Sequence, residues 1–383
     1  MPTIIEGQRS TEDILQIRRV VDISDKIYLL NPNAAPLTVL TSKLSKKETV
    51  NPRYDWMEDD IMPYWDAINC VAGYAADATL FVVDNGAYFR VGDLWKVPRT
   101  GEVFLVRTKT VVADNTLNLV ERGVGSSAKA ALVNDEPLMK LASAEEEGAG
   151  SPAAKSTLEV DKYNFTQIIK TSFEVTGTED ASKLHGGKDR NSQRNKKGIE
   201  HLIDIERQFW FGERGYDDNG THRKRFTGGV LEYVKTNVED AGGLLTEVEF
   251  ENFLRKAFKY GSSTKWGFCS PLVASVINLW AAGRLQTVPG EKTYGVAVSK
   301  YMSIHGILNL VMNKLFEGVI YGGYMAVLDM EEIDYRNMSG RDTKLETNIQ
   351  NNDVDGFKDQ YKSEVGLEIR QEKKHAILTG VSG

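Results

Sequence analysis

The sequence predicts an α+β protein that carries a small inserted β-barrel or β-sandwich domain. Three stretches of its 383 residues lead to this prediction. Short β-runs separated by turn residues fill residues 67–157, apolar residues recur at helical spacing in residues 197–212, and strand and helix patterns alternate in residues 264–312. Strands therefore dominate the part before the long helix, and both kinds of element occur after it.

The composition narrows the class of protein. Hydrophobic residues make up 41% and charged residues 26% of the chain, as in ordinary globular proteins. The net charge of −7 argues against general adhesion to nucleic acid or anionic membranes, because such binders carry a basic balance. The start lacks a signal-peptide pattern, and no apolar run approaches the ~18 residues of a membrane span. Cys70 and Cys269 match no paired-cysteine motif, so two free thiols are expected.

The sequence predicts that residues 1–45 form an N-terminal arm with little core of its own. A short helix over residues 22–30 is expected to stop at Asn31-Pro32, because a proline disfavours helical geometry in the residue before it. The chain is then expected to run extended past Pro36. Such an arm cannot bury enough apolar surface to fold alone.

Two separated stretches predict the strands of an extended ribbon. In residues 46–66, aromatic residues are interleaved with polar ones, and residues 158–182 contain a second strand. The apolar set of this second strand is Phe165, Ile168, Phe173 and Val175. Between the two stretches lies the β-domain of residues 67–157, which ends in an acidic and then Gly/Ala/Ser-rich linker.

The stretch "KGIEHLIDIERQFWFG" predicts a long, highly charged helix that ends at Gly212. Its apolar stripe is expected to pack on a sheet. Each large side chain buried in this way stabilises the fold by roughly 1.5–3 kcal/mol. The residues predicted to form the packing stripe are Ile199, Leu202, Ile203, Phe209 and Trp210.

The C-terminal half predicts an α/β lobe. A capping box that begins at Thr246 marks the start of a second helix, and Ser270-Pro271 marks the start of a third. Two alternating runs flank Gly306 and predict a strand, a turn and a strand. Residues 365–381 are expected to form a terminal hairpin.

Motifs of enzyme chemistry are weak. Gly123, Gly125 and Ala128 form a GxGxxA pattern after a strand, but a long helix does not follow, so a glycine-rich turn is favoured over a dinucleotide site. The stretch "HGGKDR" lacks P-loop spacing. The histidines show no metal-ligand spacing, and they are His185, His201, His222, His305 and His375. The sequence therefore predicts no catalytic, cofactor or metal site.

The order of elements and four stretches carry a family resemblance. The stretches are "LLNPNAAPLTVL", "RTGEVFLVRTKTVVADNTLNLVERGVGSSAKAALVNDEPLMKLASAEEEG", "KYNFTQIIKTSFEVTGT", and the pair "VSKYMSIHGILNLVMNKLF…YGGYMAVLD" and "VGLEIRQEKKHAILTG". With them, the chain resembles the major capsid proteins of tailed bacteriophages with the HK97 fold, in particular the SU10-like group. The likeness covers most of residues 20–380.

The resemblance implies how the chain is divided. Its parts would be an N-terminal arm (1–45), an E-loop (46–66 and 158–182), the inserted β-domain (67–157), a P domain with the long helix as its spine (183–261 and 325–383) and an A domain (262–324).

The resemblance also implies a function. Copies of the chain would form hexamers and pentamers that close into the icosahedral head of a tailed double-stranded DNA phage. Expected partners are the chain itself, portal and scaffolding or decoration proteins, and packaged DNA, with no membrane and no cofactor. The protein would be made in the host cytoplasm and end in the virion.

Some residues are candidates for contacts. Trp56, Met57, Phe165 and Ile168 are candidate anchors between subunits, and packing within the ribbon itself is an equally plain interpretation. DNA contact is expected to be weak and sequence-independent, through the basic residues Lys188, Arg190, Arg194, Lys196 and Lys197.

Two other functions remain open on the sequence. An encapsulin-like compartment shell would have the same fold but a protein cargo. An NAD-binding enzyme would depend on Gly123 and Gly125, and it is the less favoured alternative.

Overall fold

The computed structural model describes residues 35–109, 115–152, 154–182, 189–281, 292–293, 296–297 and 299–382. The chain divides into two compact units. The first comprises Met1–Trp56 together with Lys162–Gly383, and the second comprises Met57–Asp161. The helix expected over residues 22–30 lies outside the described residues.

The first unit is built on two sheets. One has the order β1-β21-β23-β11, with β22 also paired to β23, and the other has the order β14-β24-β20-β15-β19-β18. The strands of the first sheet are β1 (Lys46–Thr49), β11 (Gln167–Thr176), β21 (Ile333–Met338), β22 (Lys344–Glu346) and β23 (Gly356–Ile369). Those of the second are β14 (Val238–Leu244), β15 (Thr264–Cys269), β18 (Ser299–Ser303), β19 (Gly306–Met312), β20 (Met325–Leu328) and β24 (Ala376–Ser382).

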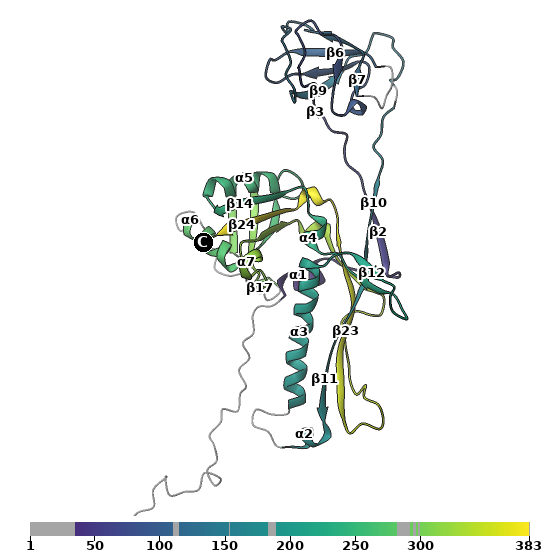
Figure 1. Cartoon of the computed structure of the whole chain (residues 1–383), viewed down its shortest axis with the longest axis vertical. Coiled ribbons are helices and arrows are strands. Elements are labelled where there is room, and N and C mark those ends of the chain that lie inside the picture. The colour runs from purple at the N-terminus through teal and green to yellow at the C-terminus, as the bar shows by residue number, and fades with distance from the viewer. Residues whose placement is uncertain are drawn as a thin grey trace, which may run out of the picture. The chain divides into compact units, whose positions relative to one another are not determined.

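The long helix α3 (Asp189–Phe211) runs along the antiparallel pair β11 and β23 (Figure 1). It extends eight residues further toward the N-terminus than residues 197–212, which the periodicity marked. The short helices α2 (Gly177–Ala181) and α4 (Val230–Tyr233) lie before and after it in the chain. Its last turns enter a core that the first sheet shares with part of the second. The helix thereby connects the two sheets.

The second sheet has a core of its own with helices α5 (Glu247–Ala257) and α6 (Pro271–Ala281). Thr246 and Glu249 form the capping box at the start of α5, as predicted. The hairpin of β18 and β19 also forms, with Gly306 at φ 157° at the turn. The remaining short elements of this unit are β12 (Gly215–Asp217), β13 (Lys224–Phe226), β16 (Lys292–Thr293), β17 (Val296–Ala297), α7 (Gly318–Tyr321), η4 (Met330–Glu332) and η5 (Glu372–Lys374).

Two secondary-structure predictions were wrong. The chain past Pro36 is not extended but forms helix α1 (Pro36–Leu44), because proline is well tolerated at the first helical position. The strands of residues 365–381 do not pair with each other. β23 belongs to the first sheet and β24 to the second, and the chain crosses between them through η5.

The second unit contains a five-stranded antiparallel sheet of order β3-β9-β5-β6-β8 and a separate pair, β4 and β7. Among the described residues these sheets do not form a closed barrel, so the barrel alternative was wrong. Aromatic residues such as Phe81, Phe89, Trp95 and Phe104 fill its core. The elements are β3 (Trp65–Ala67), β4 (Phe81–Val82), η3 (Gly86–Tyr88), β5 (Asp93–Lys96), β6 (Val103–Thr108), β7 (Thr116–Leu117), β8 (Leu119–Arg122) and β9 (Pro137–Ser143).

Strands β2 (Arg53–Glu58) and β10 (Val160–Phe165) pair with each other to form a two-stranded ribbon (Figure 1). The two strands lead out of the first unit and back into it. An isolated pair of strands is only marginally stable in water, so its base must be held by other elements.

Candidate functional site

The start of α1 is held by one buried carboxylate on α3. Glu206 is fully buried, and its two oxygens accept hydrogen bonds from the backbone N–H groups of Leu37 (3.1 Å) and Thr38 (2.7 Å). They also accept from the Thr38 hydroxyl (2.7 Å), the indole N–H of Trp210 (2.8 Å) and the side-chain amide of Asn313 (3.3 Å). Glu206 therefore joins the arm end, the long helix and the loop after β19.

The N-terminus of α1 is electrostatically favourable for the carboxylate of Glu206. The first N–H groups of a helix have no partners within the helix, and the helix dipole is positive at that end. Burial raises the pKa of the Glu206 carboxyl, while the hydrogen bonds from Thr38, Trp210 and Leu37 lower it in part. No N-cap side chain serves α1, because the residue before Pro36 is Ala35. The cap of this helix is instead supplied from about 170 positions along the chain.

The predicted packing stripe of α3 lies only partly in the core. Phe209 and Trp210 are fully buried, Ile199 and Ile203 are half-buried, and Leu202 is 37% exposed. The fully buried positions of the helix are His201, Ile205, Glu206, Phe209 and Trp210. Glu206 was missed because a charged residue was assigned to the solvent face. Its place between Ile205 and Phe209, four residues before Trp210, was the available signal.

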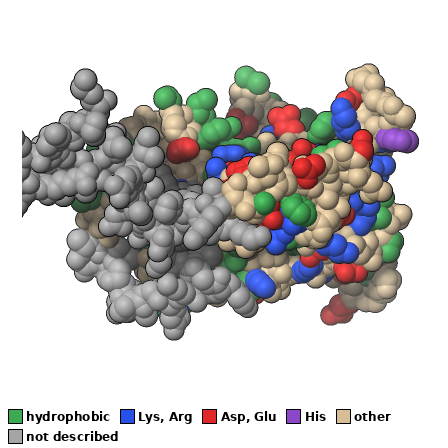
Figure 2. Space-filling view, turned by 90° about the horizontal axis from the view of Figure 1, so that it is seen from below, with side chains coloured by type: hydrophobic (Ala, Val, Ile, Leu, Met, Phe, Trp, Pro, Cys, Tyr) green, Lys and Arg blue, Asp and Glu red, His purple; other side chains and the backbone are tan. Residues whose placement is uncertain are grey.

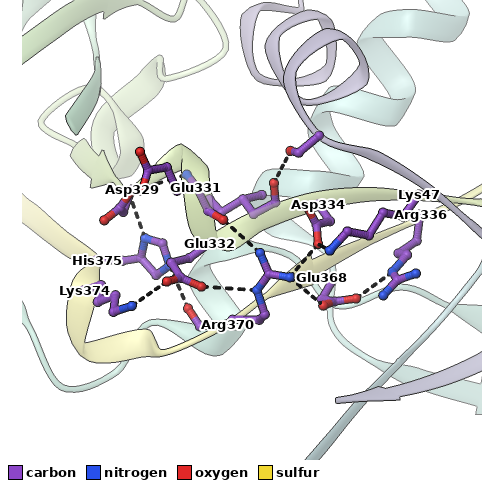
Figure 3. A network of polar contacts seen from close by, with 12 residues as sticks. Lys47, Asp329, Glu331, Glu332, Asp334, Arg336, Glu368, Arg370, Lys374 and His375 are labelled. Carbon is purple, nitrogen blue, oxygen red and sulfur yellow. Dashed lines mark hydrogen bonds and ion pairs between the residues drawn. The ribbon is translucent and has the colours of Figure 1, made fainter. Parts of the chain in front are cut away.

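A network of charges joins segments from both ends of the chain, and Figure 3 shows Arg370 at its centre. Arg370 lies 3.2 Å from Glu332, 2.7 Å from Asp334 and 3.4 Å from Glu368. Lys47 pairs with the same Asp334 at 2.5 Å. The Asp334 and Glu368 side chains are almost fully buried, so these cations offset the cost of burying their charges. The network thus holds β1 beside β21 and the end of β23.

His375 lies at the end of η5, where the chain crosses from the first sheet to the second. Its Nδ1 accepts from the backbone N–H of Asp329 (3.1 Å), and its Nε2 lies 3.2 Å from the Arg370 carbonyl (Figure 3). This pairing suits the neutral ring with its proton on Nε2. The pKa of His375 is lowered to about 4, mainly because the ring is buried.

We expect the contacts of His375, where the chain passes from the first sheet to the second, to weaken in mild acid. The folded pKa of His375 lies below its ordinary value of 6.5, so its contribution to stability is present above pH 6.5 and is lost as the pH falls toward 4. Urea unfolding at several pH values should show this loss in the wild type, and His375→Gln should flatten the slope in that window. His222→Gln, at an exposed position, is the control and should leave the slope unchanged.

The base of the ribbon is fastened by a buried amide. The Asn164 side chain donates to the carbonyls of Gly228 (3.1 Å) and Leu367 (2.7 Å) and accepts from the N–H groups of Phe165 and Gly228, both at 2.8 Å. The Tyr54 hydroxyl also donates to the Leu367 carbonyl, at 3.0 Å. These bonds anchor both strands of the ribbon to β23.

The four candidate anchors fall into two pairs. Trp56 and Phe165 are buried within the chain, where Trp56 packs against Tyr233 and Phe165 against Tyr216. Met57 is 76% exposed and Ile168 is 49% exposed. Only these two present apolar surface that a second subunit could cover.

The basic residues at the start of α3 are mostly engaged within the chain. Arg190 (2.8 Å) and Arg194 (2.8 Å) both pair with Asp359 of β23, and Lys197 pairs with Glu200 at 2.6 Å. Lys188 lies outside the described residues, and Lys196 is exposed. On the face in Figure 2, Lys and Arg side chains are interspersed with Asp and Glu. The structure therefore gives two of the predicted DNA-contacting residues, Arg190 and Arg194, a role in holding α3 on its sheet.

Acid should loosen this end of α3. Burial would raise the pKa of Asp359, but hydrogen bonds from Arg190 and Arg194 outweigh it and lower the pKa to about 2. Ionised Asp359 therefore contributes to stability above pH 3.8, its ordinary pKa, and this contribution is lost as the pH falls toward 2. Asp359→Asn should lower the urea midpoint at neutral pH, and its difference from the wild type should shrink steadily as the pH falls from 3.8 toward 2. Asp218→Asn, in an exposed pair with Arg223, should have little effect at either pH.

The weak enzyme motifs of the sequence do not form a dinucleotide-binding or metal-binding site in the described part of the chain. Gly123 and Gly125 have φ values of 68° and 70° in a turn after β8, and residues 123–136 contain no helix to hold a pyrophosphate. Within the described ranges, no group of His, Cys, Asp or Glu side chains is arranged to hold a metal ion. No helix in the described part of the chain is long and apolar enough to cross a membrane. Cys70 and Cys269 are both free thiols.

Comparisons with known proteins agree on one family. The family model described as the SU10 major capsid protein matches residues 6–382. The major capsid protein of Pseudomonas phage PaMx41 is 25% identical over 381 residues, with 91% of this chain and 90% of that protein covered.

A solved structure supports the fold. The capsid of a native GTA particle is similar with a TM-score of 0.53 and 9% identity, over 97% of this chain and 98% of the other. An encapsulin from Synechococcus elongatus covers 59% of this chain with a TM-score of 0.42 and 10% identity. The α+β architecture is that of HK97-like phage capsid proteins. With the family model spanning nearly its whole length, this chain belongs to the SU10 major capsid protein family.

Proposed function

We propose that copies of this chain assemble through hexamers and pentamers into the icosahedral head shell of a tailed double-stranded DNA phage. The observation that supports the proposal best is the ribbon of β2 and β10. Its exposed apolar residues include Met57 (76%) of β2 and Val160 (55%) of β10, and among the described residues these two strands pair only with each other. A neighbouring subunit that covers them would supply the burial that the ribbon lacks.

Assembly is tested directly on the purified chain. Sedimentation velocity and negative-stain microscopy should show rings or closed shells. Met57→Asp should reduce their amount, because a charge would then be buried at the contact, without changing the circular dichroism of the chain. Val71→Asp, at an apolar position outside the ribbon that is 94% exposed, should assemble normally. A stable compact monomer at every concentration would refute the proposal.

We propose packaged DNA, a portal, and scaffolding or decoration proteins as the further partners of the shell. We infer that the contact with DNA is weak and independent of sequence, because the chain carries a net charge of −7. The engagement of Arg190 and Arg194 by Asp359 supports the same inference. Tight, sequence-selective binding at physiological salt would contradict it.

The nearest alternative is a compartment shell around a protein cargo. We also propose that the chain is synthesised in the bacterial cytoplasm and is then incorporated into the virion. Particles purified from infected cells should contain double-stranded DNA protected from nuclease. Particles that hold protein cargo and no DNA would favour the compartment.

A further inference from the structure

The chain contains two Asn-Gly pairs, Asn85-Gly86 in the second unit and Asn219-Gly220 in the first. Asparagine is most prone to lose its side-chain amide in this pair, because glycine has no Cβ to hinder attack of its nitrogen on the asparagine side chain. The function above uses neither pair. Since the two have the same chemistry, any difference in their reactivity comes from the fold.

The fold restrains the pair in the second unit. The Asn85 side-chain amide donates to Asp66 Oδ1 at 3.0 Å, and the Asn85 backbone N–H donates to Oδ2 of the same carboxylate at 3.1 Å. The Gly86 N–H donates to Asn115 Oδ1 at 3.0 Å, and Gly86 is buried. Both groups that would have to react, the side-chain amide and the backbone nitrogen after it, are therefore held by hydrogen bonds.

The fold leaves the pair in the first unit unrestrained. Asn219 and Gly220 lie between β12 and β13, and both residues are exposed. The Asn219 backbone N–H donates to Asp217 Oδ1 at 2.9 Å. Within the described ranges, neither the Asn219 side chain nor the Gly220 N–H has a hydrogen-bond partner. The side-chain amide can therefore rotate toward the Gly220 nitrogen without breaking a bond to the rest of the chain.

We propose that Asn219 is a site of spontaneous deamidation and that the fold protects Asn85 from the same reaction. The Gly220 nitrogen loses its proton and bonds to Asn219 Cγ, the Cγ–Nδ2 bond breaks, and ammonia leaves with that proton. Water then opens the resulting cyclic imide at one carbonyl or the other, which gives aspartate or isoaspartate. Water is the only other reactant, and the proposal does not depend on how the shell assembles.

Deamidation adds a negative charge at the tip of this hairpin. Asp218 pairs there with Arg223 at 2.6 Å, and the Arg223 guanidinium lies 4.3 Å from the centre of the Tyr216 ring. The new carboxylate follows Asp217 and Asp218 directly and competes for the same cation. In the described part of the chain β12 and β13 pair only with each other, so the two large sheets of the first unit stay intact. The product is a folded chain with an altered surface.

Peptide mapping of the full-length chain after incubation at mildly alkaline pH tests the proposal. Mass spectrometry should find a gain of roughly 1 Da in residues 215–223, the tryptic peptide that holds Asn219, and isoaspartyl methyltransferase should label it. The peptide that holds Asn85 should stay unchanged over the same time. In urea the fold no longer protects Asn85, and the two sites should then react at similar rates.

Gly220→Ala is the conservative variant for this site. A Cβ at this position would lie 3.5 Å from the His222 carbonyl oxygen, which is an ordinary contact, so the chain should fold normally. Deamidation of Asn219 should slow roughly tenfold, because the methyl group hinders the approach of the nitrogen to Cγ. The urea midpoint should not change.

Asn115→Ala tests the protection in the second unit. It removes the acceptor of the Gly86 N–H, so deamidation at Asn85 should become measurable in the folded chain. Three results would overturn the proposal. They are an unchanged Asn219 in the folded wild type, equal rates at Asn85 and Asn219 before urea is added, and a rate in Gly220→Ala equal to that of the wild type.

Discussion

Replacing Glu206 with glutamine is expected to destabilise the first unit by about 3 kcal/mol, although the side chain keeps its size. One of the two oxygens becomes an amide NH₂ group, which cannot accept from the donors of α1, Trp210 and Asn313. Buried donors without an acceptor then lose their solvation without compensation. Urea unfolding should report the loss, and amide exchange should show it first in α1.

The control for this change is on the same helix. Asp204 is 49% exposed at its side chain and lies 3.6 Å from Arg207, so Asp204→Asn should cost well under about 1 kcal/mol. Equal effects of the two substitutions would show that Glu206 is not what fixes the arm end. Faster exchange confined to α1 would show that α1 detaches before the rest unfolds.

Replacing Glu102 with glutamine is expected to destabilise the second unit by about 3–5 kcal/mol. Glu102 and Arg122 form a fully buried pair with two hydrogen bonds of 2.6 Å, and the backbone N–H of Ala130 also donates to Glu102. The substitution leaves the guanidinium of Arg122 buried without its counter-charge. Amide exchange should accelerate across β5, β6, β8 and β9.

The same experiment tests whether the two units fold independently, which we infer from their separate cores. Protection in α3 and β15 should be unchanged in Glu102→Gln. Glu121→Gln affects an exposed pair with Arg107 in the same sheet, and it should change little. Equal loss of protection in β15 would mean that the units unfold together and that the proposed division is wrong.

Local patterns predicted the elements whose signals lie within a few residues. The capping box at Thr246, the proline after Ser270 and the turn at Gly306 each specify a backbone geometry on their own, and each appears at its predicted place. Pro36 was misread because proline suits both an extended chain and the first turn of a helix. What decides between them is Glu206, far away in the sequence.

Contacts between segments far apart in the sequence could not be predicted from local patterns. The hairpin expected in residues 365–381 failed because β23 and β24 find better partners in separate sheets, and no local pattern encodes that choice. The basic run before α3 is typical of a surface that binds phosphate. In the folded chain Arg190 and Arg194 neutralise Asp359 of β23 instead. A charge pattern shows how many cations there are but not which carboxylate they meet.

The parallel pairing of β1 with β21 has a consequence for synthesis on the ribosome. Ser45 donates to the carbonyl of Ile333, 288 residues later in the chain. At roughly 5–20 residues per second, the ribosome needs roughly 15–60 s to make that partner. The strands β3 to β9 of the second unit pair with one another in the described residues, so this unit can fold during the delay. The start of the first sheet must meanwhile wait without its neighbour, so β1 joins the sheet only after Ile333 has been made.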